Sequence, residues 1–208
     1  MDTYREWAPP PAWRGPVTCL WEQRVSATRV QRVVPDGCAD ILFDSSGSVT
    51  VAGLHDEVDL PTLTAGTHIR GIRLRPQAVA TVLGLPAHEL RNRVEPLDAV
   101  TRRLDLTTSP PDRVGGALRL LARMTVGEAA TTMGLSPRQL RRLLLAETGL
   151  GPKTFQRVLR LQRFLAHGGP LATAAVDAGY ADQPHLTREV TRLCGLPPAA
   201  LLAERASP

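Results

Sequence analysis

The sequence predicts an α+β protein, with a β-rich N-terminal half and an all-α C-terminal half. Three observations carry this prediction. Short apolar runs separated by turn-forming residues fill positions 17–75. From Pro76 onward the apolar spacing changes to a helical period. Beyond residue 111 the helical pattern continues almost to the end of the chain and repeats itself.

The apolar runs of the first half have the length of strands. They comprise residues 17–25, 39–43, 49–54 and 69–74. Turn formers such as Pro35-Asp36-Gly37 separate them, so we expect a small antiparallel, barrel-like domain. The helical spacing that starts at Val79 predicts a short helix that Gly84 ends, and Pro86 can open another. These helices form the expected helical tail of the domain.

A polar, proline-containing stretch, DLTTSPP at residues 105–111, separates the two halves. We place the domain boundary there. The predicted division is a β-rich regulatory or sensor-like domain at 1–104, a linker at 105–111 and an all-α domain at 112–208.

The composition is that of an ordinary globular protein, with 208 residues of which 43% are hydrophobic and 22% charged. No apolar run reaches the ~18 residues of a membrane-spanning helix. The N-terminal segment MDTYREWAPPPAW has no basic stretch followed by an apolar one, so it does not resemble a signal peptide. We therefore expect a cytoplasmic protein with no membrane partner.

The formal net charge of +5 is unevenly distributed along the chain. Residues 111–208 carry 13 Arg and Lys against 7 Asp and Glu, whereas residues 1–110 carry 12 against 13. A surface that binds a polyanion is therefore predicted in the second half.

The second half contains an internal repeat of a helix pair. Small and apolar residues at helical spacing from Val126 to Met133 precede Gly134, and 45 residues later those from Leu171 to Ala178 precede Gly179. The match then continues with an offset of 46, because the second copy has one more residue in its turn.

Each copy has the features of a helix-turn-helix unit, in which small residues allow close packing and glycine allows a sharp turn. In the first copy Ser136 is a good N-cap and Pro137 suits the first helical position. The helix that follows buries leucines and leaves three arginines on its outer face, namely Arg138, Arg141 and Arg142. A recognition helix presents its N-terminal residues to base edges in the major groove, so these arginines are predicted to contact double-stranded DNA.

The second helix of the second copy exposes Gln183, His185, Thr187 and Arg188, which are side chains that suit base edges. Between the copies, residues 152–166 form a predicted helix about 22 Å long that can hold the two units at a fixed separation. Two alternatives stay open: the arginines can be a solvated helix face, and the helical half can be a protein-binding module.

The segment GYADQPHLTREVTRLCGLPPAAL, residues 179–201, resembles the signature of AraC/XylS-type regulators. The segment LSPRQLRRLLLAETGLGPKTFQRVLRLQRFL, residues 135–165, is similar to the first recognition helix and connecting helix of that family. The resemblance covers about residues 112–204 and implies a bacterial transcription factor whose two units sit in successive major grooves. The DNA-contacting residues that it implies are Arg138, Arg141 and Arg142 in the first unit, and Gln183, Pro184, His185, Thr187 and Arg188 in the second.

The second unit departs from the family pattern. Leu186 and Val190 stand where aromatic residues are common, and Pro184 cannot donate from its backbone. These departures bear on base specificity more than on the fold.

The first half also has a resemblance. VVPDGCADILFD, residues 33–44, and GIRLRPQAVATVLGLPAHELRNRVEPLD, residues 71–98, look like the sensor-like domain that precedes this DNA-binding module in many actinobacterial members. The resemblance implies a domain that controls DNA affinity or contact with RNA polymerase. A small-molecule effector and a homodimer remain open.

Few residues suggest chemistry of their own. Cys38 follows a turn and is either a reactive thiol or a small buried residue at the start of a strand. Trp21, together with Trp7 and Trp13, either lines a small-molecule pocket or covers an open barrel end. Cys38 and Trp21 are therefore the candidate ligand-binding residues of the first half.

The sequence indicates no cofactor or metal site. His55, Asp56, Glu57 and His68 can supply ligands only if two strands bring them together, and their spacing does not require it. The three cysteines are widely spaced and odd in number, which fits a reducing compartment better than a disulfide framework or a zinc cluster.

No grouping of serine, histidine and carboxylate and no glycine-rich phosphate loop is present, so we expect a protein that is not an enzyme. The alternative is an alkyl-acceptor or redox-sensing DNA-binding protein that uses Cys38. The zinc-ligand cysteines of such an alkyl acceptor are missing from the sequence.

Overall fold

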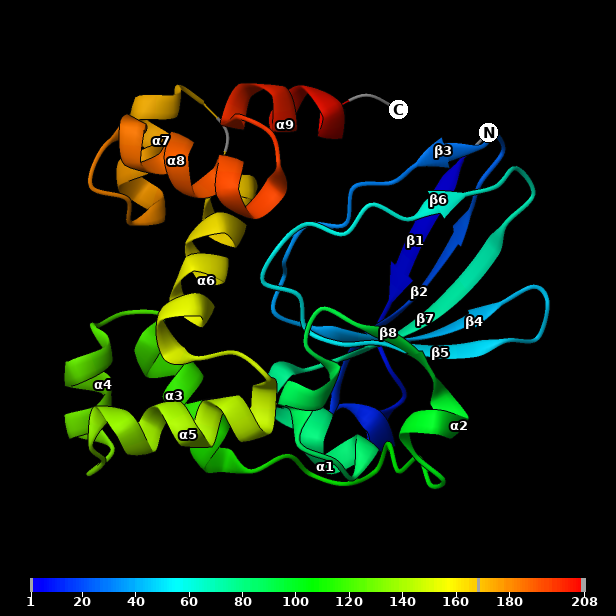
Figure 1. Cartoon of the computed structure of the whole chain (residues 1–208), viewed down its shortest axis with the longest axis horizontal. Coiled ribbons are helices and arrows are strands. Elements are labelled where there is room, and N and C mark those ends of the chain that lie inside the picture. The colour runs from blue at the N-terminus through cyan, green and yellow to red at the C-terminus, as the bar shows by residue number, and fades with distance from the viewer. Residues whose placement is uncertain (1, 168, 207–208) are drawn as a thin grey trace.

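A computed structural model of the chain describes residues 2–167 and 169–206 and confirms the α+β class (Figure 1). An antiparallel sheet with short helices occupies the N-terminal half, and the C-terminal half is helical. The long helix α6 (Pro152–Ala166) stands beside the sheet, with one group of C-terminal helices at each of its ends.

The strands form one large sheet and one small one. They are β1 (Thr3–Trp7), β2 (Val17–Arg24), β3 (Arg29–Val30), β4 (Ala39–Asp44), β5 (Val49–Ala52), β6 (Thr62–Leu63), β7 (His68–Leu74) and β8 (Val94–Pro96). The large sheet has the order β1-β2-β7-β4-β5-β8, and β3 pairs with β6. Neighbouring strands of both sheets are antiparallel.

The four predicted apolar runs are confirmed as β2, β4, β5 and β7. The edge strands β1 and β8 were not predicted. Because β1 and β8 lie at opposite ends of the strand order, the sheet is open, and the barrel-like description holds only loosely.

The two faces of the large sheet differ in chemistry. On one face Ile41, Val51 and Ile72 are buried against the helical tail. The other face carries Trp21, which crosses the sheet so closely that a Cβ added at Gly71 would lie 2.0 Å from its ring. Only glycine is compatible with that approach.

The helical elements comprise three 3₁₀ turns and a longer set of α-helices in the described residues. They are the short 3₁₀ turns η1 (Pro11–Trp13), η2 (Pro76–Ala78) and η3 (Ala87–Leu90), and the helices α1 (Val79–Leu83), α2 (Leu97–Val100), α3 (Asp112–Leu121), α4 (Val126–Thr132), α5 (Pro137–Thr148), α6, α7 (Leu171–Ala178), α8 (Gln183–Cys194) and α9 (Pro198–Ala206). None of the helices in the described ranges is long and apolar enough to cross a membrane.

The expected helix after Val79 is confirmed as α1, which ends at Gly84 with φ of 72°. The second helix of the tail is the turn η3, which follows Pro86. Residues 105–111 connect the tail to α3 and contain no helix or strand, although Leu106 is buried. The division at this stretch stays a prediction.

The apolar core does not divide at that stretch. One continuous cluster contains Ile41 and Leu74 of the sheet, Val82 of α1, and Leu140 and Leu144 of α5. A second cluster lies at the far end of α6 and joins α7, α8 and α9. The first helix pair of the repeat therefore packs with the N-terminal half, an arrangement that the sequence pattern did not reveal.

Candidate nucleic-acid interface

The first helix-turn-helix unit consists of α4, a turn at Gly134 and α5. Gly134 has φ of 65°, a conformation that favours glycine. Both helices begin with a capping box, Thr125 with Glu128 and Ser136 with Gln139. The predicted turn and N-cap are thus confirmed, and the N-terminal end of α5 is defined by its own side chains.

The outer face of α5 carries the three predicted arginines. Arg138, Arg141 and Arg142 are exposed, whereas Leu140 and Leu144 of the same helix are fully buried. Among the described residues no carboxylate pairs with any of these three arginines. Their charges are therefore available to an external anion.

The second unit repeats this construction with α7, a turn at Gly179 and α8. Gly179 has φ of 89°, and the side chain of Asp182 caps α8 by accepting a hydrogen bond of 2.6 Å from the backbone N–H of His185. Leu186 and Val190 are buried on the inner face of α8. Leucine and valine thus fill the positions at which the family commonly has aromatic residues.

The residues of α8 that were predicted to contact DNA differ in exposure and in their hydrogen bonds within the protein. Gln183, Pro184 and Arg188 are exposed. His185 is held within the unit, because its Nδ1 accepts a 3.2 Å hydrogen bond from the N–H of Ala181 and its ring packs edge-on against Tyr180.

The hydroxyl of Thr187 donates to the carbonyl oxygen of Gln183 at 2.9 Å, so this threonine has its methyl group left for an outside contact. Of the predicted residues of α8, Gln183 and Arg188 thus have polar side chains that are exposed and form no hydrogen bond or ion pair within the described residues.

Helix α6 is attached to α3 and to α8 through side chains that the sequence pattern did not mark. Gln156 donates from its Nε2 to the carbonyl oxygens of Leu121 and Met124, at 3.1 and 2.7 Å, and so caps the end of α3. Arg160 donates to Glu189 of α8 at 2.8 Å. These bonds attach α6 to the end of α3 at one point and to the second recognition helix, α8, at another.

Comparison with known proteins agrees with this geometry. Residues 129–204 match a family described as a helix-turn-helix domain, and residues 5–96 match a family described as a domain of unknown function, DUF6597. The helix-turn-helix match begins within α4 and covers the rest of both units. A pair of such units joined by one helix, with the signature at 179–201, is the arrangement of the AraC type. The chain carries an AraC-type DNA-binding domain.

Curated relatives match only in part. The regulatory protein Ada of Salmonella typhimurium is 34% identical over 91 residues, and the bifunctional transcriptional activator/DNA repair enzyme Ada of Escherichia coli is 33% identical over 91 residues. Each match covers 41% of this chain, and the chain spans about a quarter of the length of these relatives.

Two solved structures are similar to the chain at low sequence identity. An AraC-type transcriptional regulator from Chromobacterium violaceum is 23% identical, with a TM-score of 0.43, over 47% of this chain and 95% of that one. ToxT from Vibrio cholerae is 9% identical, with a TM-score of 0.49, over 89% of this chain and 92% of that one.

The half that precedes the AraC-type domain carries a partly buried polar cluster around Arg73. The guanidinium of Arg73 lies 3.3 Å from Asp40, 3.6 Å from Asp36 and 3.3 Å from Glu6. Burial raises the pKa of Asp40, and Arg73 partly offsets this. Trp21 donates from its Nε1 to the same Asp40 carboxylate at 2.7 Å.

The three tryptophans do not gather at one place. Trp21 is buried and packs against Tyr4 in a tilted arrangement, with 5.8 Å between ring centroids, whereas Trp7 is exposed. Since the strands form an open sheet and not a barrel, there is no barrel end of the predicted kind for them to cover. Trp21 instead acts as a hydrogen-bond donor within the Arg73 cluster.

Cys38 lies at the edge of this cluster. Burial raises the pKa of its thiol, and the nearby carboxylate of Asp36 acts in the same direction. Asp36 also accepts a 2.8 Å hydrogen bond from the backbone N–H of Cys38 and so fixes the turn. A thiol in this environment is disfavoured as a thiolate nucleophile.

Two of the four candidate metal ligands, His68 and Asp56, are engaged in separate ion pairs. His68 pairs with Glu22, whereas Asp56 pairs with Arg91 and accepts a hydrogen bond from Asn92. Within the described part of the chain no three His, Cys, Asp or Glu side chains gather as a metal site would require.

Proposed function

We propose that the chain is a sequence-specific transcriptional regulator that binds double-stranded DNA through α5 and α8. The observation that supports this most directly is the pair of exposed arginine-bearing helix starts, at Arg138–Arg142 on α5 and at Arg188 on α8, each on a helix-turn-helix unit. As a DNA-binding regulator it acts in the cytoplasm of a bacterium.

Each recognition helix enters a major groove with its N-terminal turns. On α5, Arg138, Arg141 and Arg142 face bases and the adjoining phosphates, since arginine pairs with guanine or with phosphate. On α8, Gln183 suits adenine and Arg188 suits guanine, with Pro184, His185 and Thr187 shaping the contact around them. The family resemblance supplies these roles, and the exposure of the side chains supports them.

The spacing of the two units supports binding by one chain. Helix α6 has 15 residues and is therefore about 22 Å long. Successive major grooves on one face of DNA lie about 34 Å apart, a distance that α6 together with the units at its two ends can span. In this proposal a homodimer is not needed for DNA binding.

The N-terminal half controls DNA affinity or contact with RNA polymerase in this proposal. The N-terminal half contacts α6 directly. Gln162 of α6 donates to the carbonyl oxygen of Pro35 at 2.6 Å. Gly37 lies so close to α6 that a Cβ added there would be 3.4 Å from Phe155. A small-molecule effector that reshapes the 35–38 turn would therefore act on α6.

We further propose that the chain is not an enzyme. The alternative, an alkyl-acceptor or redox-sensing protein that uses Cys38, is disfavoured by the raised pKa of that thiol. The relative Ada of Escherichia coli is named as a DNA repair enzyme, but the match to it covers only 26% of its length.

Footprinting on duplexes selected by the full chain tests the proposal. The expected footprint is asymmetric and about 20 base pairs long, since one chain reads two successive major grooves. Arg141→Ala and Arg188→Ala should each reduce the free energy of DNA binding by about 1–3 kcal/mol. They should relax base preference at opposite ends of the site. Arg113→Ala, an exposed arginine of α3, serves as the control and leaves the base preference unchanged.

A different result would contradict the two-unit proposal. It is a short palindromic footprint that only a dimer binds and in which both arginine variants act at the same bases.

A further inference from the structure

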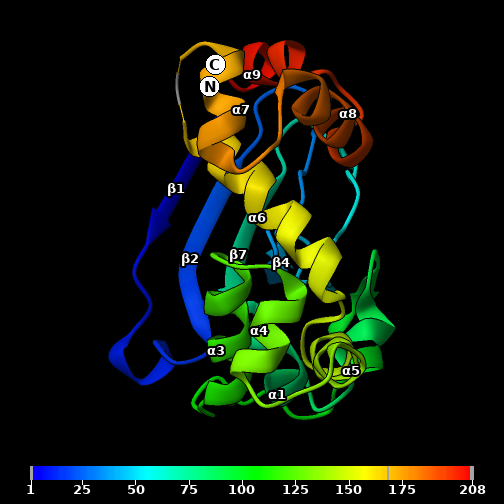
Figure 2. The same ribbon diagram turned by 90° about the vertical axis from the view of Figure 1, so that its left-hand side faces the viewer.

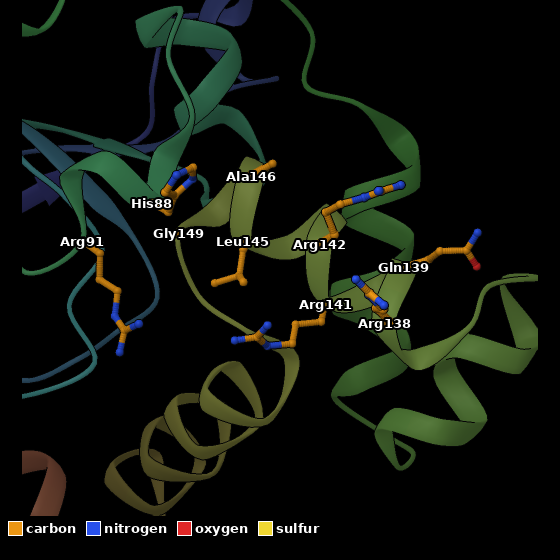
Figure 3. A pocket seen from close by; sticks show the side chains of 9 residues that line it. All are labelled: His88, Arg91, Arg138, Gln139, Arg141, Arg142, Leu145, Ala146 and Gly149. Atoms are coloured by element: carbon orange, nitrogen blue, oxygen red, sulfur yellow. The ribbon is translucent and has the colours of Figure 1, made fainter.

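A groove of about 690 Å³ runs along the outer side of α5, and the N-terminal half forms its second wall (Figure 3). Arg138, Arg141 and Arg142 of α5 line it on one side. His88 of η3 and Arg91, the residue that follows η3, line it on the other. The groove therefore combines the predicted DNA-reading side chains with two basic side chains from the other half of the chain.

The two walls are held together by a close backbone contact. Gly149 ends α5 with φ of 76°, and a Cβ added there would lie 2.8 Å from the carbonyl oxygen of Ala87 in η3. Ala87 and Leu90 of η3 are buried, which leaves His88 on the exposed side. The position of His88 beside α5 is thus fixed by the packing of η3 and does not depend on a flexible loop.

Arg91 is also held in place. Its Nε donates to Asp56 at 3.1 Å, its Nη2 pairs with the other oxygen of the same carboxylate, and Asn92 donates to Asp56 at 2.8 Å. This pair occupies one edge of the guanidinium. Nη1 has no partner within the described residues, and 42% of the side chain is exposed.

The charges around the groove favour an anion of extended shape. Four guanidinium groups line it, and none of its lining residues is acidic. Asp56 neutralises part of the charge of Arg91, and Glu89 lies next to His88 in the chain, so the excess positive charge is greatest toward α5. Leu145 and Ala146 of α5 add an apolar part to the lining.

We propose that this groove holds the DNA strand that flanks the major groove entered by α5, with Arg91 and His88 contacting its phosphates. A phosphodiester chain has the required charge and length, and phosphate contacts position a recognition helix without reading sequence. The inference rests on the proposed function, because α5 must first lie in the major groove. It assigns to the N-terminal half a direct part in holding DNA.

The test uses the full chain and two duplexes, one selected by the wild type and one of random sequence. Arg91→Ala and His88→Ala should each weaken binding to both duplexes by the same factor, roughly three- to tenfold at low salt for one lost phosphate contact. For Arg91→Ala the slope of log affinity against log salt should become shallower by about one. Sequence preference should not change.

Two matched variants separate a phosphate contact from other effects. Arg24→Ala removes an exposed arginine at the far end of β2, beside β1, and should leave affinity unchanged. Asp56→Asn breaks the same ion pair as Arg91→Ala but retains the arginine. It should tighten DNA binding, because it removes the negative charge of a carboxylate beside the groove.

Three outcomes would overturn the inference. One is unchanged affinity for Arg91→Ala while Arg141→Ala still loses base preference, which leaves the proposed function intact. Another is equal weakening by Asp56→Asn and Arg91→Ala, which would attribute the effect to the shape of the loop. The third is tighter binding by Arg91→Ala, which would mean that η3 obstructs DNA. If the wild type binds neither duplex, the proposed function itself fails.

Discussion

Arg32 of the N-terminal half donates from its Nη1 to the carbonyl oxygen of Cys194 at 2.7 Å. Cys194 is the last residue of α8, where carbonyl groups lack intrahelical partners and the helix dipole is negative. The Nε of Arg32 also donates to Glu204 of α9 at 3.0 Å. The N-terminal half thus contacts the second unit as well as the first, on the side of α6 that faces the sheet (Figure 2).

Replacement of Arg32 by alanine should loosen the second unit. The hydrogen bond to a helix end is charge-assisted, but Glu204 is half-exposed, so we expect a loss of about 1–2 kcal/mol in the free energy of unfolding. Hydrogen exchange should accelerate at the end of α8 and in α9. Arg205→Ala, an exposed neighbour on α9, is the control. Unchanged hydrogen exchange in α8 would show that the bond from Arg32 to Cys194 does not stabilise the second helix-turn-helix unit.

Gly149→Ala should destabilise the chain more than Gly134→Ala. Both glycines have positive φ, so either substitution costs about 1–2 kcal/mol in backbone strain. At Gly134 nothing lies within 4 Å of the added Cβ, whereas at Gly149 the carbonyl oxygen of Ala87 lies at 2.8 Å. Urea unfolding of both variants measures the difference. Equal losses in the free energy of unfolding for the two variants would mean that the close contact between α5 and η3 adds nothing to the cost of Gly149→Ala.

Arg73→Met should destabilise the protein in a pH-dependent way. Without Arg73 the pKa of Asp40, already raised by burial, should rise further. When a carboxyl group has a higher pKa in the folded than in the unfolded protein, the free energy of unfolding falls as the pH rises from the unfolded-state pKa through the folded-state pKa. The loss relative to wild type should therefore be about 3–5 kcal/mol at pH 7 and smaller near pH 4.

Urea unfolding at the two pH values, with the exposed Arg70→Met as control, measures the effect of Arg73. A loss that is the same at both pH values would contradict a charge-based role for this arginine.

Cys38 should react slowly with a thiol-specific reagent in the native protein. The raised pKa of its thiol lowers the thiolate fraction at pH 8, so we expect labelling at least roughly tenfold slower than in urea. Peptide mapping by mass spectrometry separates Cys38 from Cys19 and Cys194, which are free but buried. Cys38→Ser should retain DNA binding. Rapid native labelling at Cys38 would restore the reactive-thiol alternative.

Local patterns in the sequence were sufficient to predict most elements of the helical half. The spacing of apolar residues, the glycines at 134 and 179 and the cap at Ser136 are properties of short segments, and the structure confirms each. The exposure of Arg138 and Arg188 follows from the same periodicity.

Contacts between distant segments could not be predicted in this way. Strand β1 has all five residues exposed, so it carries no alternation of buried and exposed positions. The bond from Arg32 to Cys194 joins residues 162 positions apart, and nothing local marks either of them. The second wall of the groove beside α5 was missed for the same reason, because His88 and Arg91 lie in a turn without a DNA-binding motif.

The uninterrupted apolar core from the sheet through α1 to α5 has a thermodynamic consequence. Side chains that share one core are expected to unfold together, so the N-terminal half and the first unit form one cooperative folding unit. A ligand that binds only the folded N-terminal half then also reduces the population of unfolded α5, and DNA bound at α5 stabilises the sheet in return. Effector and DNA would be linked through the shared unfolding equilibrium, without any hinge between them.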